Sequence, residues 1–257
     1  MSAENYETKW WGITYDQWNE RGGRRHVHEQ EFQFYRDQLQ HIKGPILEAA
    51  CGTGSILLRL AKLGHAIWGF DASEEMLAQL KQKAVEQSVP KVLEHISQQT
   101  FVDFRYEQKF SAIIIPAAAF MHIPNQKEQI ACLENIHAHL EPDGRLLLNF
   151  YIPPWDYLMR HSREPLVEEE FGTFEHPQNE LPIEVTHKTA IDLSEQRETI
   201  YWTFTHDGQS HEVPLYSRWI YKEEFQLLLR VAGFSNWQLF GSHDCEPYVG
   251  SSDLTKI

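Results

Sequence analysis

The chain has 257 residues, of which 42% are hydrophobic and 23% charged, and its formal net charge is −14 at pH 7. This composition is typical of a globular protein, and the length suits one domain that carries an insertion. A surface this acidic repels the phosphate backbone of nucleic acids, so the sequence predicts no nucleic-acid partner and mildly favours neutral or cationic ligands.

The cysteine, histidine and hydropathy patterns indicate the setting of the protein. Cys51, Cys132 and Cys245 form no CxxC pair and suit a reduced, cytoplasmic location. Residues 1–10 lack the apolar core of a signal peptide, and the longest apolar run, Ala112 to Met121, is too short to span a bilayer. The histidines have no cysteine or carboxylate partners at ligand spacing. We therefore predict no metal and no membrane contact, and the oligomeric state stays open.

The first segment, residues 1–43, shows no strand pattern. Residues 29–42 carry apolar side chains at helical spacing, which predicts an amphipathic helix lying on a sheet. The aromatic stretch before that helix suggests a lid over a pocket. We interpret Trp10 and Trp18 within it as packing residues.

Residues 44–73 predict a strand, a glycine turn, a helix and a second strand. The apolar run from Pro45 to Ala50 has the length of a buried strand, and Gly52 and Gly54 follow it. A short helix then ends at Gly64, and the next apolar run ends at Asp71. Both strand ends open on one edge of the sheet, where α/β proteins bind ligands. The turn offers backbone N–H groups, and Asp71 can accept hydrogen bonds from the two hydroxyls of a ribose.

Two kinds of nucleotide cofactor compete for this site. A dinucleotide fingerprint requires G-x-G-x-x-G, and Leu57 stands where the third glycine belongs. That glycine allows close packing of helix on strand, so its absence disfavours a nicotinamide-dependent reductase. A protein that binds a nucleotide without catalysis remains an alternative.

The segment from Glu48 to Gly54, EAACGTG, resembles motif I of the class I S-adenosylmethionine-dependent methyltransferases of small molecules, and Asp71 to Leu77, DASEEML, resembles their D-x-S-x-x-M-L continuation. The resemblance implies a Rossmann-like doubly wound α/β fold with a seven-stranded sheet and S-adenosylmethionine as cofactor. The cofactor-binding residues that it implies in these segments are Glu48, Ala50, Gly52, Thr53, Gly54, Asp71, Ala72 and Met76.

The same resemblance assigns roles to residues before motif I. Tyr15 matches an early tyrosine that closes over the methyl donor in similar enzymes, and we count it with the catalytic residues. A following arginine meets the carboxylate of the donor there. Arg25 is our choice for that contact, with Arg24 as the alternative.

Beyond Asp71 the helices and strands continue to alternate, with Ser73 and Asn125 as predicted N-caps. The predicted elements are a helix over 73–86, strand three over 92–96, strand four over 110–115, a helix over 125–140 and strand five over 146–150.

Two loops of this region resemble family segments. Thr100 stands where the family has an aspartate that holds the adenine amino group, so Thr100 or the backbone near Phe101 is expected to replace it. Pro116 and Ala117 begin the loop that lines the methyl-transfer centre in the family. His122 matches a histidine that contacts the substrate in similar amine methyltransferases. With an ordinary pKa of about 6.5, it could accept a proton from the acceptor near neutral pH.

After Tyr151 three runs alternate polar and apolar residues over 183–193, 197–206 and 211–221, which predicts an antiparallel meander. An insertion after strand five resembles the β cap over the substrate in small-molecule methyltransferases. A helix over 222–232 and a hairpin formed by 237–240 and 248–251 are expected to complete the sheet. The predicted units are a lid (1–43), a cofactor-binding core (44–151), an inserted cap (152–221) and the closing part of the core (222–257).

These features predict transfer of a methyl group from S-adenosylmethionine to a nitrogen or oxygen nucleophile of a small molecule by in-line displacement. The residues expected to face the acceptor are His122, Tyr151, Trp155, Tyr216 and Arg218. For Arg218 the alternatives are an anionic acceptor and a carboxylate of the cap.

Overall fold

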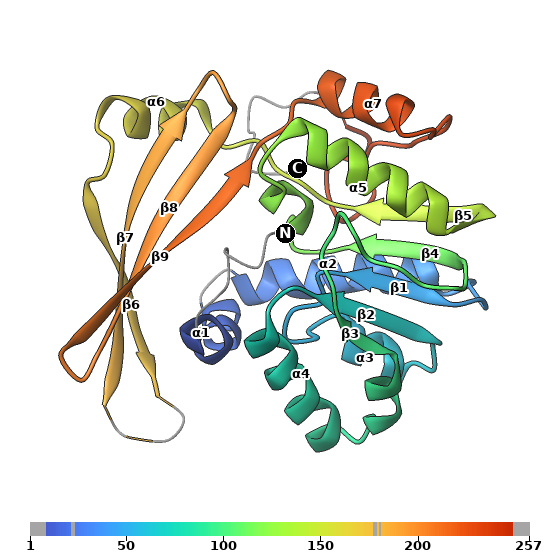
Figure 1. Ribbon diagram of the computed structural model, residues 1–257, viewed down its shortest axis with the longest axis horizontal. Coiled ribbons are helices and arrows are strands. Elements are labelled where there is room, and N and C mark those ends of the chain that lie inside the picture. The colour runs from blue at the N-terminus through green and yellow to red at the C-terminus, as the bar shows by residue number, and fades with distance from the viewer. Residues whose placement is uncertain (1–8, 22–23, 177–178, 180, 249–257) are drawn as a thin grey trace.

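The computed structural model describes residues 9–248 apart from 22–23, 177–178 and 180. It contains a parallel sheet covered by helices and a separate antiparallel sheet, which Figure 1 shows side by side. The parallel sheet has the order β3-β2-β1-β4-β5, and the antiparallel sheet the order β6-β7-β8-β9. This is a Rossmann-like α/β architecture with a β cap.

The helices and strands of the described residues have the following bounds. The strands of the parallel sheet are β1 (Ile46–Ala49), β2 (Ile67–Asp71), β3 (Ile96–Gln98), β4 (Phe110–Ile115) and β5 (Leu140–Leu148). The strands of the cap are β6 (Glu168–Glu175), β7 (Pro182–Asp192), β8 (Arg197–His206) and β9 (Gln209–Arg218). The helices are α1 (Lys9–Asn19), α2 (Arg24–Leu39), α3 (Leu57–Lys62), α4 (Glu74–Glu86), α5 (Gln126–His139), α6 (Trp155–Arg163) and α7 (Lys222–Val231), with 3-10 turns η2 (Pro90–His95) and η3 (Ala119–His122).

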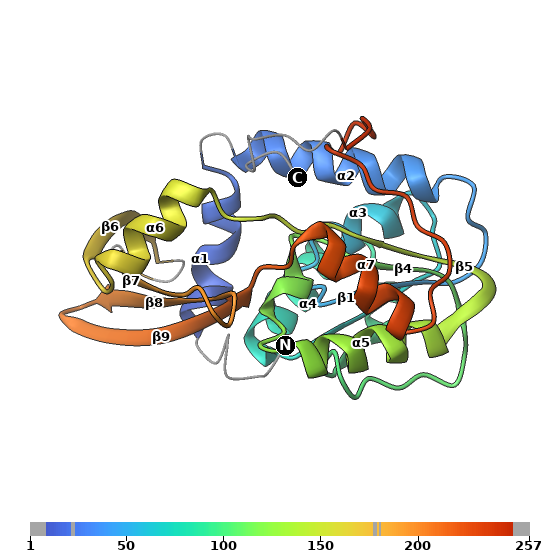
Figure 2. The same cartoon turned by 90° about the horizontal axis from the view of Figure 1, so that it is seen from above.

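The inner strands β1, β2 and β4 of the parallel sheet are buried on both faces, as their continuous apolar sequences predict. Ala112 and Ile114 of β4 pack in the cluster that contains α2, α3 and α4, whereas Ile113 and Ile115 pack in the other cluster with α5. Figure 2 shows helices above and below the sheet. Ser73 and Asn125 cap α4 and α5 by accepting backbone N–H bonds at 3.2 Å and 2.9 Å, as predicted.

Two predicted parts of the sheet differ from the structure. Residues 90–95 form η2 rather than strand three, because Pro90 fixes the first turn, and β3 begins only at Ile96. The predicted closing hairpin is also absent from the described residues, where the sheet has five strands and not seven. Residues 237–240 make only an isolated bridge between Phe240 and Pro247, and 249–251 lie outside the described part.

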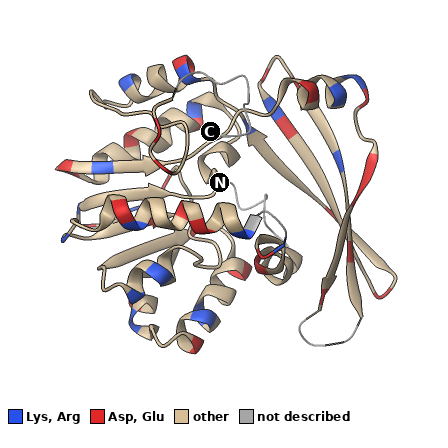
Figure 3. Cartoon of the chain, turned by 180° about the vertical axis from the view of Figure 1, so that it is seen from behind, with Lys and Arg blue, Asp and Glu red and all other residues tan. Residues whose placement is uncertain are grey.

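The cap contains more than the predicted meander. Its three predicted strands correspond to β7, β8 and β9, but β6 and α6 were not predicted. β6 carries the acidic run 168–170, whose exposure is typical of an edge strand. Figure 3 shows acidic and basic residues interspersed over the helices and strands. None of the helices in the described residues is long and apolar enough to cross a membrane.

Helix α1 lies between the cap and the core. Trp11 contacts Phe204 of β8 with ring centroids 5.3 Å apart, and Trp18 contacts Phe171 of β6 at 5.3 Å. Trp10 is also buried against the cap, so the interpretation of Trp10 and Trp18 as packing residues is confirmed. Because each indole buries a large apolar area, these contacts attach the N-terminal segment firmly to the cap.

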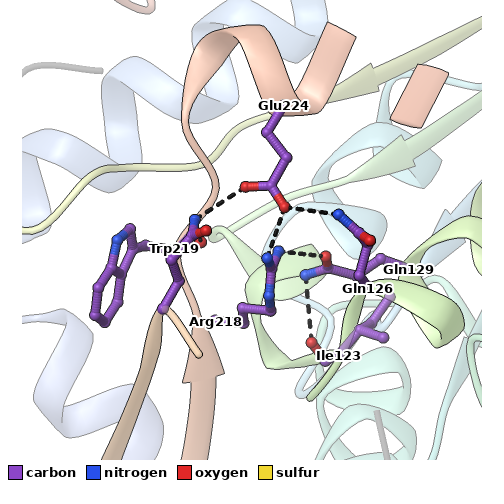
Figure 4. A network of polar contacts seen from close by, with 7 residues as sticks. Ile123, Gln126, Gln129, Arg218, Trp219 and Glu224 are labelled. Carbon is purple, nitrogen blue, oxygen red and sulfur yellow. Dashed lines mark hydrogen bonds and ion pairs between the residues drawn. The ribbon is translucent and has the colours of Figure 1, made fainter. Parts of the chain in front are cut away.

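A buried polar network joins the end of the cap to the core (Figure 4). Arg218 of β9 donates to Gln129 of α5 at 3.0 Å and to Glu224 of α7 at 2.6 Å. Glu224 also accepts hydrogen bonds from Gln126 and Gln196. For Arg218 the sequence left an anionic acceptor and a carboxylate of the cap as alternatives. Its guanidinium is paired with a carboxylate, but that of Glu224 in the core, and with the amide of Gln129.

We predict that Arg218→Ala lowers the free energy of unfolding by about 3 kcal/mol, because Glu224 and Gln129 lose a largely buried partner. Arg197→Ala is the matched control, since Arg197 lies opposite Arg218 on β8 and is exposed, and it should change stability by about 0.5 kcal/mol or less. Urea unfolding followed by circular dichroism measures both. Equal losses in the two variants would contradict the structural role of Arg218.

Candidate active site

The glycine turn after β1 shapes one wall of the site. Ala50, Gly52 and Gly54 have φ angles of 58°, 51° and 80°, a left-handed conformation that favours glycine. A Cβ added at Gly54 would come within 2.9 Å of Leu80, so this position requires glycine for packing. A Cβ at Gly52 would meet nothing within 4 Å among the described residues. The backbone at Gly52 is therefore open for the close approach of a ligand.

Asp71 fixes this turn against the end of β2. One of its carboxylate oxygens accepts the N–H of Gly52 at 2.8 Å, and the other accepts the N–H of Ser73 at 2.9 Å. Burial raises the pKa of Asp71, although both N–H bonds oppose the shift. Each oxygen keeps a second lone pair, so the carboxylate can still accept hydrogen bonds from vicinal hydroxyls.

A pocket of about 380 Å³, its open mouth included, lies at the carboxyl edge of the parallel sheet. Its lining combines α1, the ends of β1 and β2, the first turns of α4 and the loop after β4. The lining residues are Tyr15, Ala50, Gly52, Asp71, Met76, Ala117, Ala119 and His122. All of them except Ala119 were predicted site residues, although they come from five separate segments.

The loop after β4 is strained and held by groups that the sequence did not reveal. Ala117 and Ala118 have φ angles of 55° and 54°, which cost energy for residues with a Cβ. Glu31 of α2 accepts the N–H of Ala117 at 2.6 Å, and Asn149 accepts the N–H of Ala118 at 3.1 Å. Glu31 stands four residues before the buried Tyr35, so its place on the apolar face of α2 was a signal that we missed.

Two carboxylates are buried beside this loop without a lysine or arginine ion pair among the described residues. Glu48 at β1 is 2% exposed and Glu31 is 3% exposed. Within the described structure, Oε2 of Glu48 has no hydrogen-bond partner. Burial raises the pKa of both groups, and the charges of Glu31 and Asp71 raise that of Glu48 further. Such a site is complementary to a cationic group that donates hydrogen bonds, as the ammonium of a methionine moiety does.

His122, at the end of η3, is held by the cap. Its Nδ1 lies 2.9 Å from the carbonyl oxygen of Tyr216 on β9. Because a carbonyl only accepts, Nδ1 carries the proton and Nε2 is the unprotonated nitrogen of the ring. Burial lowers the pKa of His122 to about 4, although the bond to Tyr216 opposes the shift. The imidazole is therefore neutral at physiological pH.

Some predicted cofactor residues lie outside the pocket lining. Thr53 donates to Asp16 of α1 at 2.7 Å and accepts from Lys83 of α4 at 3.1 Å, so its hydroxyl joins α1 to the core. Thr100 donates to Asp103, and Phe101 packs against Phe70. Ala72 and Pro116 are buried next to lining residues.

Other predicted residues stand at the surface. Arg25 is exposed at the start of α2, and the side chain of Arg24 lies outside the described structure. Tyr151 and Trp155 are 40% and 61% exposed near the start of α6. Tyr216 meets the site through its backbone carbonyl. The described residues hold no group of three or more histidines, cysteines and acidic residues placed to bind a metal.

Comparison with known proteins identifies the class to which this site belongs. Residues 46–144 match the family model of the methyltransferase domain, which covers the turn, Asp71 and the loop after β4. The chain therefore carries a methyltransferase domain over these residues, and its cofactor is S-adenosylmethionine. The buried carboxylates of Glu31 and Glu48, the open backbone at Gly52 and the acceptor capacity of Asp71 fit this cofactor.

Three known proteins illustrate the similarity. The dTDP-3-amino-3,6-dideoxy-alpha-D-glucopyranose N,N-dimethyltransferase of Streptomyces fradiae is 26% identical over 74% of this chain and 69% of that relative. The putative methyltransferase YqeM of Bacillus subtilis is 33% identical, but the match spans only 42% of this chain and 43% of that protein. The CcbJ methyltransferase structure from Streptomyces caelestis shares the fold, with a TM-score of 0.72, 21% identity and coverage of 96% of this chain and 95% of that one.

We predict that Asp71→Asn weakens binding of S-adenosylhomocysteine at least tenfold, because charge-assisted hydrogen bonds to the ribose are lost. Asp37→Asn, an exposed carboxylate on α2, is the control and should leave binding unchanged. Isothermal calorimetry measures both affinities. Equal affinity of Asp71→Asn and the wild type would remove Asp71 from the cofactor site.

We also predict that the cofactor-free protein loses stability as the pH rises above about 5. The pKa of Glu48 is raised by folding, so the folded state binds more protons than the unfolded chain until the pH passes the raised value. Glu48→Gln should make this loss smaller, whereas Glu94→Gln on the surface should not. Urea midpoints between about pH 5 and about pH 8 test this, and an unchanged pH dependence in Glu48→Gln would contradict it.

Proposed function

We propose that this enzyme methylates an amino group of a small molecule. The observation that carries the proposal is the neutral His122, which lines the cofactor pocket and whose Nδ1 donates to the Tyr216 carbonyl, so that Nε2 is the ring nitrogen able to accept a hydrogen bond. The unprotonated ring nitrogen can accept a hydrogen bond from the N–H of a neutral amine, and this bond orients the amine. The single lone pair of the amine nitrogen can then point at the methyl group.

The likeness to the S. fradiae enzyme supports an amine as the acceptor. That relative is named for adding methyl groups to the nitrogen of an amino sugar carried on a nucleotide. The acidic net charge of the present chain also favours an acceptor without a negative charge.

In the mechanism, the protein binds and orients the cofactor and the acceptor, and it excludes water. S-adenosylmethionine supplies a methyl group that its sulfonium already activates. Glu48 and Glu31 hold the cationic end of the cofactor and Asp71 its ribose. Tyr15 covers the pocket from α1, and burial raises its pKa to about 12, so it stays a neutral phenol. Thr100, Phe101, Ala72, Pro116 and Arg25 remain proposed cofactor neighbours on the resemblance alone.

The proton that leaves the amine is not stored on His122. The sequence suggested a base that titrates near neutral pH, but burial lowers the pKa of His122 to about 4, so it binds a proton weakly at pH 7. We therefore propose that His122 orients the acceptor and does not act as the base.

Two further inferences complete the proposal. Tyr151 and Trp155 are proposed to contact the acceptor near the entrance of the pocket. The three free cysteines support a cytoplasmic location.

Incubation of the enzyme with a metabolite extract and S-adenosylmethionine labelled with ¹³C in its methyl group tests the proposed function. The methyl resonance of the product distinguishes N-methyl from O-methyl carbon. We expect labelled N-methyl groups. Label found only in O-methyl groups would contradict an amine acceptor, and no transfer at all would contradict the enzyme function.

We predict that His122→Asn lowers kcat/KM about 10²-fold with the acceptor found in that way, with cofactor affinity unchanged. The fall of the rate at acid pH should persist in the variant, because it reports protonation of the acceptor amine. His41→Asn, on the surface, is the control. A His122→Asn variant with wild-type turnover would show that the imidazole does not orient the acceptor.

A further inference from the structure

The inner face of the cap carries a buried carboxylate that the cofactor site does not use. Glu198 on β8 is 3% exposed and lies opposite Ser217 on β9. One of its oxygens accepts the hydroxyl of Tyr157 from α6, and the other accepts the hydroxyl of Ser217 at 3.0 Å. Both donors are neutral, so they do not balance a negative charge.

The face that carries Glu198 is turned towards the core. Glu198 and Trp202 are four residues apart on β8 and therefore point to the same side of the sheet. Trp202 contacts Trp11 of α1, the helix that lies between cap and core. Figure 1 shows α6 over the same end of the cap where β9 leaves for the core. Glu198 is thus on the side of the cap that faces the cofactor-binding core.

A hydrogen-bond donor without an acceptor among the described residues lies against Tyr157, the residue that donates to Glu198. His161 of α6 is 3% exposed, and its ring is 4.4 Å from that of Tyr157. Arg160 donates to Nε2 of His161 at 2.7 Å, so Nδ1 carries the proton. This Nδ1 is buried and has no partner among the described residues. An unmade bond of this kind costs free energy unless a ligand or water completes it.

The cluster is connected to the methyl-transfer centre through β9. Ser217, which bonds Glu198, directly follows Tyr216, whose carbonyl holds His122. Glu198 forms no ion pair with another described residue. Arg218, which follows Ser217 on β9, is paired with Glu224. Within the described structure, the Glu198 carboxylate therefore has only neutral hydroxyl partners.

We propose that Glu198, Tyr157, Ser217 and His161 form an acceptor subsite that binds a hydroxyl or second amino group of the substrate, away from the nitrogen that is methylated. A hydroxyl both donates and accepts, so it is chemically complementary both to a carboxylate such as Glu198 and to an N–H donor such as that of His161. The substrate class that fits is a polyhydroxylated amine. This inference rests on the proposed amine methylation, and it adds the recognition of a distant polar group.

The simpler role of the cluster is to attach α6 to the cap sheet, and a matched pair of probes separates the two roles. Glucosamine and cyclohexylamine are both six-membered rings with one amine, but only glucosamine carries hydroxyls. Binding of each to protein saturated with S-adenosylhomocysteine is measured by ligand-observed NMR titration. We expect the wild type to bind glucosamine at least tenfold more tightly than cyclohexylamine.

Glu198→Gln keeps the shape of the side chain and removes its charge, so we expect this preference to fall at least tenfold. Tyr157→Phe keeps the ring against His161, removes the hydroxyl and should act in the same direction, which covers the case in which Glu198→Gln does not fold. Glu212→Gln, an exposed change on β9, is the control and should retain the preference. Affinity for S-adenosylhomocysteine should be unchanged in all three variants.

The subsite is overturned if the wild type binds the two amines equally or does not bind glucosamine, or if a folded Glu198→Gln or Tyr157→Phe variant retains the full preference. The proposed function is judged separately, by transfer of the labelled methyl group to the metabolite extract. Selective binding without transfer would contradict amine methylation and leave the subsite supported. Transfer without selective binding would contradict the subsite alone.

Discussion

The structure depends on the burial of negative charge at the carboxyl edge of the parallel sheet. Glu31, Glu48 and Asp71 are each at most 4% exposed, and their pKa values are raised by loss of solvation. A protein retains such groups only where other interactions offset their cost. Backbone N–H groups of Gly52, Ser73 and Ala117 offset part of it, and the same bonds fix the turn and the loop that line the pocket. A cofactor with a cationic end and two vicinal hydroxyls completes the arrangement.

Helix α1 connects the pocket to the cap through hydrogen bonds on both sides. Asp16 bonds Lys83 and Thr53 of the core, while Gln17, the next residue, exchanges hydrogen bonds with the backbone of Glu175 on β6 at 2.8 Å and 3.0 Å. Tyr15, beside them, lines the pocket. A displacement of α1 would therefore alter the lining of the pocket and the contacts with the cap together, and the three buried or half-buried indoles of α1 oppose such a displacement.

The sequence predicted those features that depend on local chemistry. Gly52, Gly54 and Asp71 were found because a tight turn and an acidic strand end have signatures within one supersecondary unit. Glu31 and Asn149 were missed because their function comes from a loop far away in the chain. Thr53 was interpreted as a cofactor residue because its motif is specific, yet its hydroxyl meets Asp16, a contact that no local pattern encodes. Burial likewise keeps the imidazole of His122 neutral, so it can accept a hydrogen bond but is not the base that the sequence suggested. Desolvation is a property of the folded protein and cannot be predicted from a local pattern.

The division of labour between core and cap follows from the way β9 ends. Its last residues alternate in what they hold: the Tyr216 carbonyl fixes His122, the Ser217 hydroxyl meets Glu198, and the Arg218 guanidinium joins α5 and α7. The position of His122 relative to the pocket is therefore set by the same strand that carries Ser217, the hydrogen-bond partner of Glu198 in the cap. Because an in-line displacement tolerates little error in the position of the nucleophile, this connection of His122 to β9 suits the orienting role that we propose for the imidazole.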